Sequence, residues 1–224
     1  MKKLLAALFA ALCFTSPALA SDPEIKTWKT YHSLGCMLLK ECTDGVDRIR
    51  SSSDLAGHFT TFEDKGTRAE FDELVLALNM SGVGVYIADE KYFPDGTRGS
   101  YHTPTNNFFL NKYYAQYPHV AITVIRHEGW HAAQDCMAGT IDNTMLAIIH
   151  NEEDIPGVWR AIAASTYDKS PLPWEQEALW AGHTPHMTVK ALNACARGRM
   201  WEAYTPTPMT EEWLIDNGYI KSKG

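Results

Sequence analysis

The stretch 126–136 reads RHEGWHAAQDC and sets two histidines, His127 and His131, four residues apart. Apolar residues recur at helical spacing before the first histidine, which predicts a helix over 119–137 that ends near Gly139. Side chains four positions apart lie on the same face of a helix, so the two imidazoles can point to one position. The sequence therefore predicts a central helix that carries a pair of adjacent histidines, with the rest of the fold arranged around it.

Two imidazoles that converge on one point can form part of a zinc site, with Zn–N distances of about 2.0–2.1 Å. Glu128 adjoins His127, so it would flank a metal ion rather than bind it, and it can take a proton from an activated water molecule. Gly129 is unfavourable within a helix by roughly 1 kcal/mol. Gln134 is expected on an exposed face of the helix, and the alternative is that it makes a hydrogen bond near the site. The alternative is that His127 and His131 belong to an ordinary helix without a metal.

A catalytic zinc site needs a third protein ligand and keeps one position open. The segment 174–182, WEQEALWAG, follows Pro173 and predicts a short helix that contains Glu175 and Glu177. Because these glutamates are two residues apart, they face different sides of a helix, and only one of them is expected to bind the metal. His183, just beyond this helix, is a further alternative ligand.

The motif H-E-x-x-H followed by a glutamate on a later helix resembles the gluzincin metallopeptidases. In several of those families an alanine stands three residues after the ligand glutamate, as Ala178 does after Glu175, so the resemblance implies Glu175 as the third zinc ligand and Glu128 as the general base. Those families often carry Asp or Asn four residues after the ligand, where this chain has Leu179, so the hydrogen-bond partner of a zinc histidine must come from another residue. The metzincin pattern is excluded, because the third and sixth residues after the second histidine are Gln and Met.

Segments on both sides of the central helix indicate an α+β fold. The segment 21–52 is expected to be partly helical, 67–80 has apolar residues at helical spacing, and 83–88 (VGVYIA) is typical of a strand. A turn is expected at 94–96, and 100–111 is expected to be an extended strand or the edge of a sheet. Beyond the motif, helices are expected at 141–150, 174–182, 186–197 and 210–217.

These elements make up one predicted zincin-like domain that spans residues 21–224. A small sheet with an edge strand lies on its N-terminal side, the central zinc helix follows, and the C-terminal part is helical. In small gluzincins a bound peptide adds as a strand to the edge of the sheet. The resemblance implies that 100–111 receives the peptide in this chain.

The first twenty residues predict a signal peptide that is cleaved after Ala20. Lys2 and Lys3 form a basic start, Leu4–Phe14 is apolar but too short to span a bilayer, and Ala18–Ala20 is a typical cleavage site. Cleavage would leave 204 of the 224 residues and change the formal charge from −7 to −9. With no dense cluster of Lys and Arg, we expect a periplasmic or secreted protein without a membrane span and without a nucleic-acid partner.

Four cysteines follow the predicted signal peptide, and an even number in an exported chain suggests two disulfides. Three pairings are open, and the alternative is that some cysteines are buried free thiols. We favour a local bridge from Cys36 to Cys42. The second bridge would then join Cys136, at the end of the motif helix, to Cys195 on a later helix.

The combined features predict an exported zinc-dependent peptidase that acts on a peptide or protein substrate. Two alternatives stay open: a non-catalytic binding or adaptor protein with a metallopeptidase fold, and a zinc hydrolase that cleaves a cell-wall amide or ester bond. A His or Tyr side chain usually helps to stabilise the oxyanion of such a reaction. The candidates are Tyr101, His183, His186 and Tyr204.

Overall fold

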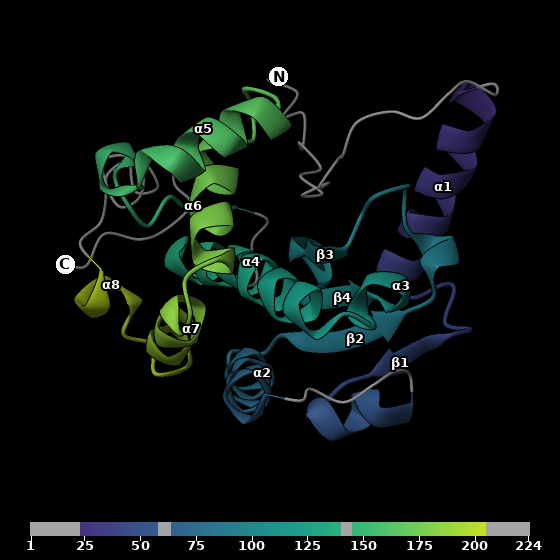
Figure 1. The fold of residues 1–224 in the computed structure, drawn as a ribbon, viewed down its shortest axis with the longest axis horizontal. Helices are drawn as coiled ribbons and strands as arrows, with labels where there is room; N and C mark the ends of the chain where they lie inside the picture. Colours follow the sequence, from purple (N-terminus) through teal and green to yellow (C-terminus); the bar gives the residue numbers. More distant parts are fainter. Residues whose placement is uncertain (1–22, 58–63, 140–144, 205–224) are drawn as a thin grey trace, which may run out of the picture.

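The computed structural model describes residues 23–57, 64–139 and 145–204 of the chain. The predicted signal peptide at 1–20 and the predicted helix at 210–217 lie outside the described residues. The fold is α+β, as expected, and helix α4 lies between a sheet with α1 on one side and the C-terminal helices on the other (Figure 1). The described helices are α1 (Pro23–Leu38), α2 (Lys65–Met80), α3 (Lys112–Ala115), α4 (Pro118–Met137), α5 (Gly157–Thr166), α6 (Leu172–Gly182), α7 (Met187–Ala196) and α8 (Met200–Ala203). The described strands are β1 (Val46–Arg48), β2 (Gly84–Ala88), β3 (Gly99–His102) and β4 (Asn107–Asn111).

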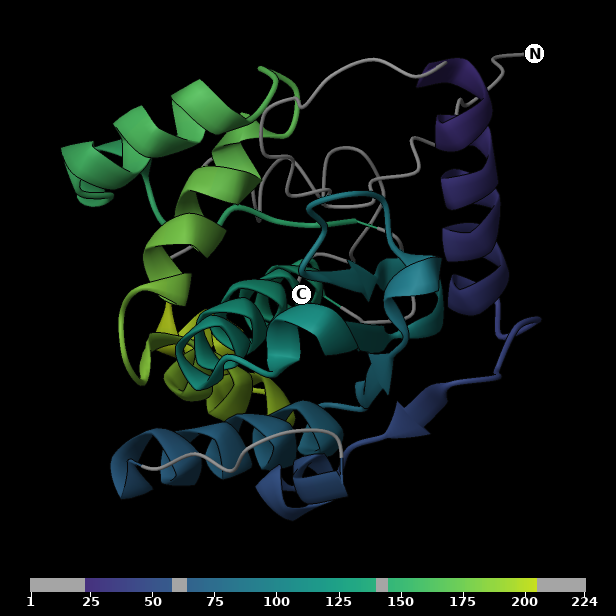
Figure 2. The same ribbon diagram turned by 45° about the vertical axis from the view of Figure 1, so that its right-hand side comes forward.

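The sheet is mixed, with the strand order β1-β2-β4-β3. Strands β2 and β4 are parallel, with Val85 opposite Phe108, and the two outer strands are antiparallel to their neighbours. Because side chains alternate along a strand, Val85 and Phe108 join a core with α2 and α4 on one face, whereas Tyr86 stacks on Phe109 at 5.3 Å on the other face. Helix α1 packs on that second face, on the opposite side of the sheet from α5 and α6 (Figure 2).

The predicted extended segment 100–111 is two strands rather than one. Strands β3 and β4 form a hairpin, and the chain turns through Thr103–Thr105 and Asn106, which adopts a left-handed conformation with φ 51°. Pro104 cannot donate a ladder hydrogen bond, so it interrupts the strand at this point. The expectation of an edge strand is therefore confirmed for β3, while β4 lies inside the sheet.

The predicted helix at 141–150 is wrong over residues 145–150, which form neither helix nor strand and bend at His150. The backbone N–H groups of Ile149 and His150 donate to the carboxylate of Glu177, and that of Ala147 donates to the carbonyl oxygen of Gln134. Helical hydrogen bonds within this segment are replaced by bonds to α4 and α6, because the buried carboxylate needs donors. We call residues 145–150 the capture loop.

The other long helices of the prediction are confirmed: 67–80, 119–137, 174–182 and 186–197 correspond to α2, α4, α6 and α7. Helix α5 was not predicted. Ala163 is the one residue of this helix that is buried.

Helix α4 is closely packed by its neighbours at a glycine within the motif. A Cβ atom on Gly129 would lie 2.9 Å from Thr188 Cγ2 of α7 and 3.8 Å from Leu78 Cδ2 of α2. The Thr188 hydroxyl also donates to the carbonyl oxygen of Arg126. The unfavourable helix propensity of Gly129 is therefore offset by close contact between α4 and α7.

Gly129→Ala is expected to lower the free energy of unfolding by about 1–3 kcal/mol, because overpacking outweighs the gain in helix propensity. Thr188→Ser removes the obstructing methyl group and keeps the hydroxyl, so Gly129→Ala should be neutral or stabilising in that background. Urea denaturation of the four proteins measures both effects. An equal loss in the two backgrounds would contradict the proposed contact.

A buried ion pair joins α2 to α4 just before the motif. Arg126 donates to both carboxylate oxygens of Glu70, at 2.8 Å and 2.6 Å, and the backbone N–H of His186 donates to the same carboxylate. Burial raises the pKa of Glu70, but Arg126 and the His186 N–H outweigh it and hold the pKa below its usual value. This carboxylate therefore ties α2, α4 and the start of α7 together.

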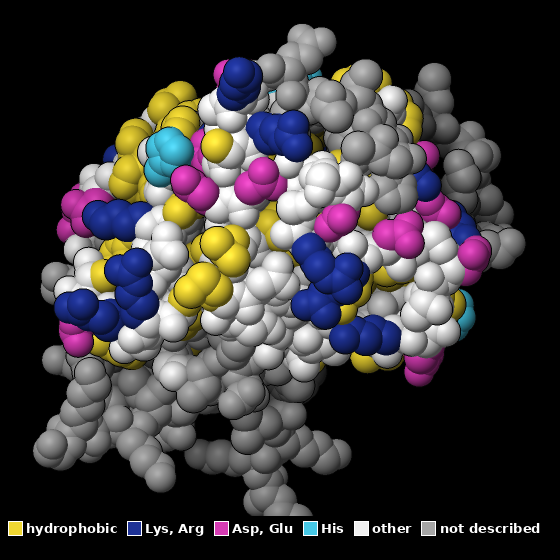
Figure 3. Space-filling view, turned by 90° about the horizontal axis from the view of Figure 1, so that it is seen from below, with side chains coloured by type: hydrophobic (Ala, Val, Ile, Leu, Met, Phe, Trp, Pro, Cys, Tyr) yellow, Lys and Arg dark blue, Asp and Glu magenta, His cyan; other side chains and the backbone are white. Residues whose placement is uncertain are grey.

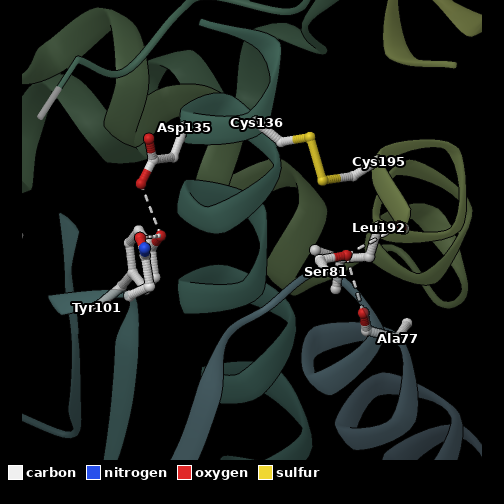
Figure 4. The surroundings of a disulfide bond; sticks show 8 residues. Ala77, Ser81, Tyr101, Asp135, Cys136, Leu192 and Cys195 are labelled. Atoms are coloured by element: carbon white, nitrogen blue, oxygen red, sulfur yellow. Dashed lines mark hydrogen bonds between the residues drawn. A yellow bond between two sulfur atoms is a disulfide. The ribbon is translucent and has the colours of Figure 1, made fainter. Parts of the chain in front are cut away.

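Both favoured disulfides are confirmed. Cys36 and Cys42 close a short loop after α1, and Cys136 at the end of α4 is bonded to Cys195 of α7 (Figure 4). The second bridge fixes the motif helix α4 to α7, through two cysteines that are 59 residues apart in the sequence.

Replacing Cys136 and Cys195 together by Ala is expected to lower the free energy of unfolding by about 4 kcal/mol, and replacing Cys36 and Cys42 by about 2 kcal/mol. The difference arises because the Cys136–Cys195 bridge closes the longer loop in the unfolded chain. Urea denaturation of the oxidised proteins measures both losses. A larger loss for the short loop would contradict this ranking.

The described surface carries charges of both signs. On the face seen in Figure 3, Lys and Arg side chains lie among Asp and Glu side chains. No helix in the described part of the chain is long and apolar enough to cross a membrane. The absence of a nucleic-acid partner stays a prediction.

Candidate metal centre

His127 and His131 of α4 and Glu175 of α6 form a buried cluster. One ligand atom from each lies within 4.8 Å of the others. His127 Nε2 is 3.3 Å from Glu175 Oε2, His131 Nε2 is 3.7 Å from Glu175 Oε1, and the two imidazole rings lie edge to face. Helix α6 reaches α4 closely because Gly182 lies against it: a Cβ there would be 3.3 Å from the His127 Cβ.

The donor atoms of this cluster fit a metal ion. Among the described residues, His131 Nε2 and Glu175 Oε2 are buried without a hydrogen-bond partner, which is costly unless another group satisfies them. Burial opposes ionisation of Glu175, but the imidazoles of His131 and His127 outweigh it and hold the pKa of this carboxyl below its usual range. Two imidazole nitrogens and one carboxylate oxygen form a set that transition metals accept, so this group could bind a metal ion.

Glu128 lies beside the cluster and faces the edge strand. Its Oε2 accepts a hydrogen bond of 2.8 Å from the backbone N–H of Tyr101 in β3. Burial raises the pKa of Glu128, the histidines and the Tyr101 N–H oppose this, and the nearby Glu175 carboxylate adds to the rise. The net rise moves Glu128 toward the pKa range of a general base.

Tyr101 is held against α4 by Asp135, as Figure 4 shows. The Tyr101 hydroxyl donates a buried hydrogen bond of 2.6 Å to Asp135 Oδ2, and burial together with this carboxylate raises the pKa of the phenol. Asp135 was missed from the sequence, although it follows Glu128 by seven residues and so lies two turns along the same face of the helix. The hydrogen bond between Tyr101 and Asp135 holds β3 close to α4, so that the Tyr101 N–H reaches the Glu128 carboxylate.

Glu177, the alternative ligand, lies outside the described cluster. Its carboxylate accepts hydrogen bonds from Trp130 Nε1, Gln134 Nε2 and the backbone N–H groups of Ile149 and His150 in the capture loop. Burial raises the pKa of Glu177 to about 7, although these donors oppose the rise. Of the two candidate glutamates, Glu175 therefore belongs to the cluster. Glu177 instead joins α6 to α4 and to the capture loop through its hydrogen bonds.

The remaining candidates make contacts elsewhere. The His183 ring stacks on Trp159 of α5 at 4.4 Å, so the cluster found among the described residues does not include it as a ligand. His186 is exposed near Glu73, and Tyr204 lies edge to face with Trp130 and His150. The expectation that one of the four candidate side chains stabilises an oxyanion stays a prediction.

Comparison with known proteins leaves the centre to be interpreted from its own geometry. No protein-family model, curated protein or solved structure matches the chain.

Removing one ligand is expected to abolish metal binding. The oxidised wild-type protein, equilibrated with excess divalent transition metal and then freed of unbound metal, should retain about one ion per chain, and Glu175→Ala or His131→Ala should retain none. Elemental mass spectrometry measures the content.

Glu177→Gln is the matched control, because it changes a buried carboxylate on the same helix that lies outside the cluster. It should keep one ion at saturating metal, although the protein loses stability as an amide faces donors. Loss of metal with Glu177→Gln but not with Glu175→Ala would contradict the assignment.

Proposed function

We propose that this protein is an exported zinc-dependent peptidase of the gluzincin type. The observation that carries the proposal is the position of the Glu128 carboxylate. It interacts electrostatically with His127, His131 and Glu175, and it is bonded to the edge strand of the sheet. A base beside a His-His-Glu set and next to a strand edge is an arrangement suited to metal-dependent hydrolysis of an extended peptide.

The three ligands would hold zinc, and a bound zinc ion would polarise the substrate carbonyl and lower the pKa of a water molecule toward ~7. Glu128 then takes the proton of the attacking water and passes it to the leaving amine. The Tyr101 N–H orients Glu128 by binding one of its oxygens. Burial excludes bulk water from the base, so its charge interacts strongly with the reacting atoms.

The register of β3 supports binding of a peptide along its outer edge. The N–H of Asn111 donates to the carbonyl oxygen of Arg98, and hydrogen-bonded pairs alternate along an antiparallel ladder. The backbone groups of Gly99 and Tyr101 therefore point away from β4. A peptide that adds to this edge would pass beside Glu128, and it would pair with outward backbone groups other than the Tyr101 N–H, which is bound to Glu128.

Export is proposed from the predicted signal peptide, and the two disulfides are compatible with an oxidising compartment. The expected location is the periplasm or the extracellular medium.

Glu128→Gln is expected to reduce peptide hydrolysis by about 10²–10⁴-fold while the zinc content stays at one ion per chain. The amide keeps the shape of the side chain but cannot take a proton. Cleavage of a mixed peptide library by the zinc-loaded protein, followed by mass spectrometry, measures the loss.

The same zinc-loaded protein should be tested on cell-wall amides and on esters. If the protein cleaves one of these substrates and leaves the peptides uncleaved, it is the alternative zinc hydrolase of a cell-wall amide or ester bond. No cleavage of any substrate by a fully loaded wild-type protein would favour the binding or adaptor alternative.

A further inference from the structure

Gln134 is fully buried beside the metal centre, and the expectation that it lies on an exposed helix face is wrong. It follows His131 by three residues on α4 and extends toward α6. Its Oε1 is 2.8 Å from His131 Nδ1, and its Nε2 is 2.8 Å from Glu177 Oε2 and 3.2 Å from the carbonyl oxygen of Trp174. Every polar atom of this side chain therefore has a partner.

The partners determine which way the Gln134 amide points. The Trp174 carbonyl can only accept a hydrogen bond, so the NH₂ group must face it and Glu177. The amide oxygen must then face His131. The orientation follows from the chemistry of the partners, and a flipped amide would set oxygen against oxygen at both contacts.

The orientation of the amide in turn determines the tautomer of His131. The Gln134 oxygen can only accept, so His131 Nδ1 must carry the proton that it receives. In a neutral imidazole the lone pair then lies on Nε2, which is the buried atom that faces Glu175 in the cluster. A donor opposite Nδ1 would favour the other tautomer and leave Nε2 unable to bind a metal.

We propose that Gln134 is a positioning residue that fixes the Nδ1–H tautomer and the ring orientation of His131, and that Glu177 holds Gln134 in the required direction. The inference rests on the metal site of the proposed function but not on the bond that is cleaved. It also supplies the partner of a zinc histidine that Leu179 cannot provide.

The chemistry explains why an amide stands at this position. The side chain must accept one hydrogen bond from His131 and donate two, to Glu177 and to the Trp174 carbonyl, and the planar amide of Asn or Gln offers one acceptor oxygen and two N–H donors. A glutamate would set a second carboxylate within about 3 Å of Glu177, where two like charges disfavour each other. The capture loop anchors Glu177 from its far side, so the chain of hydrogen bonds runs from His131 through Gln134 and Glu177 to the backbone of Ile149 and His150.

The first test reads the tautomer directly. In metal-free protein at an alkaline pH where the ring is neutral, ¹H–¹⁵N spectra of the His131 ring should show a protonated Nδ1 and an unprotonated Nε2. Gln134→Leu, which keeps a similar volume, should populate both tautomers. A protonated Nε2 in the wild type, or an unchanged tautomer in Gln134→Leu, would overturn the inference.

The second test measures zinc affinity by competition with a chelator. Gln134→Leu should weaken zinc binding by about 10–100-fold. Trp130→Phe is the matched control, because it removes another donor to Glu177 without touching His131. It should lower stability and leave zinc affinity within about threefold of the wild type. Equal zinc affinity in Gln134→Leu and the wild type would overturn the inference.

Both tests are independent of hydrolysis. A protein with the expected tautomer and the expected loss of zinc affinity, but without cleavage of any substrate, would retain this inference and lose the proposed peptidase. If zinc-loaded Gln134→Leu cleaves peptides at the full rate and its zinc affinity is unchanged, the proposed peptidase is retained and this inference is lost.

Discussion

The candidate metal centre depends on the close packing of α6 against α4. Small residues on α6 allow this approach, and at Gly182 the two helices are so close that a Cβ would press on His127. The approach brings Glu175 to the two histidines, but it also buries Glu177 on the same helix. A buried carboxylate must be paired or hydrogen-bonded, so each of the two glutamates needs its own set of polar partners.

The carboxylates of Glu175 and Glu177 are surrounded by different kinds of partner. Glu175 faces imidazole nitrogens whose lone pairs converge with its own oxygens, and such a set is satisfied by a cation. Glu177 faces N–H groups from an indole, an amide and two backbone positions, and such a set is satisfied without a cation. Two positions of one helix therefore separate a group suited to metal binding, Glu175, from a group that holds the structure together, Glu177. Gln134 connects them, because it donates to Glu177 and accepts from His131.

The sequence was sufficient for features that depend on local pattern. The motif helix and the glutamate helix could be predicted because residue spacing carries that information. The even cysteine number predicted two disulfides but left three pairings open, of which the favoured one is present. The capture loop, the buried Gln134 and the Tyr101–Asp135 pair could not, because each depends on a partner distant in the chain. Residues 145–150 are the clearest case: their backbone donors bind Glu177, 27 and 28 positions away, in place of a helical ladder. The sheet edge was predicted in the right region, but a turn at Pro104 and Asn106 divides it into two strands.

The hydrogen bonds and the ion pair made by α4 indicate that the three side chains of the candidate centre are held in position before a metal ion binds. Arg126 binds Glu70 of α2, Glu128 binds the backbone of β3, and Asp135 binds Tyr101. Gln134 donates a hydrogen bond to Glu177 of α6, and Cys136 is bonded to Cys195 of α7. Five residues of one helix are thus fixed to four different elements, and rotation or sliding of the helix would break several buried bonds at once. The entropic cost of assembling the ligands is therefore met by folding rather than by metal binding, which favours tight binding of an ion whose ligands are held at fixed positions.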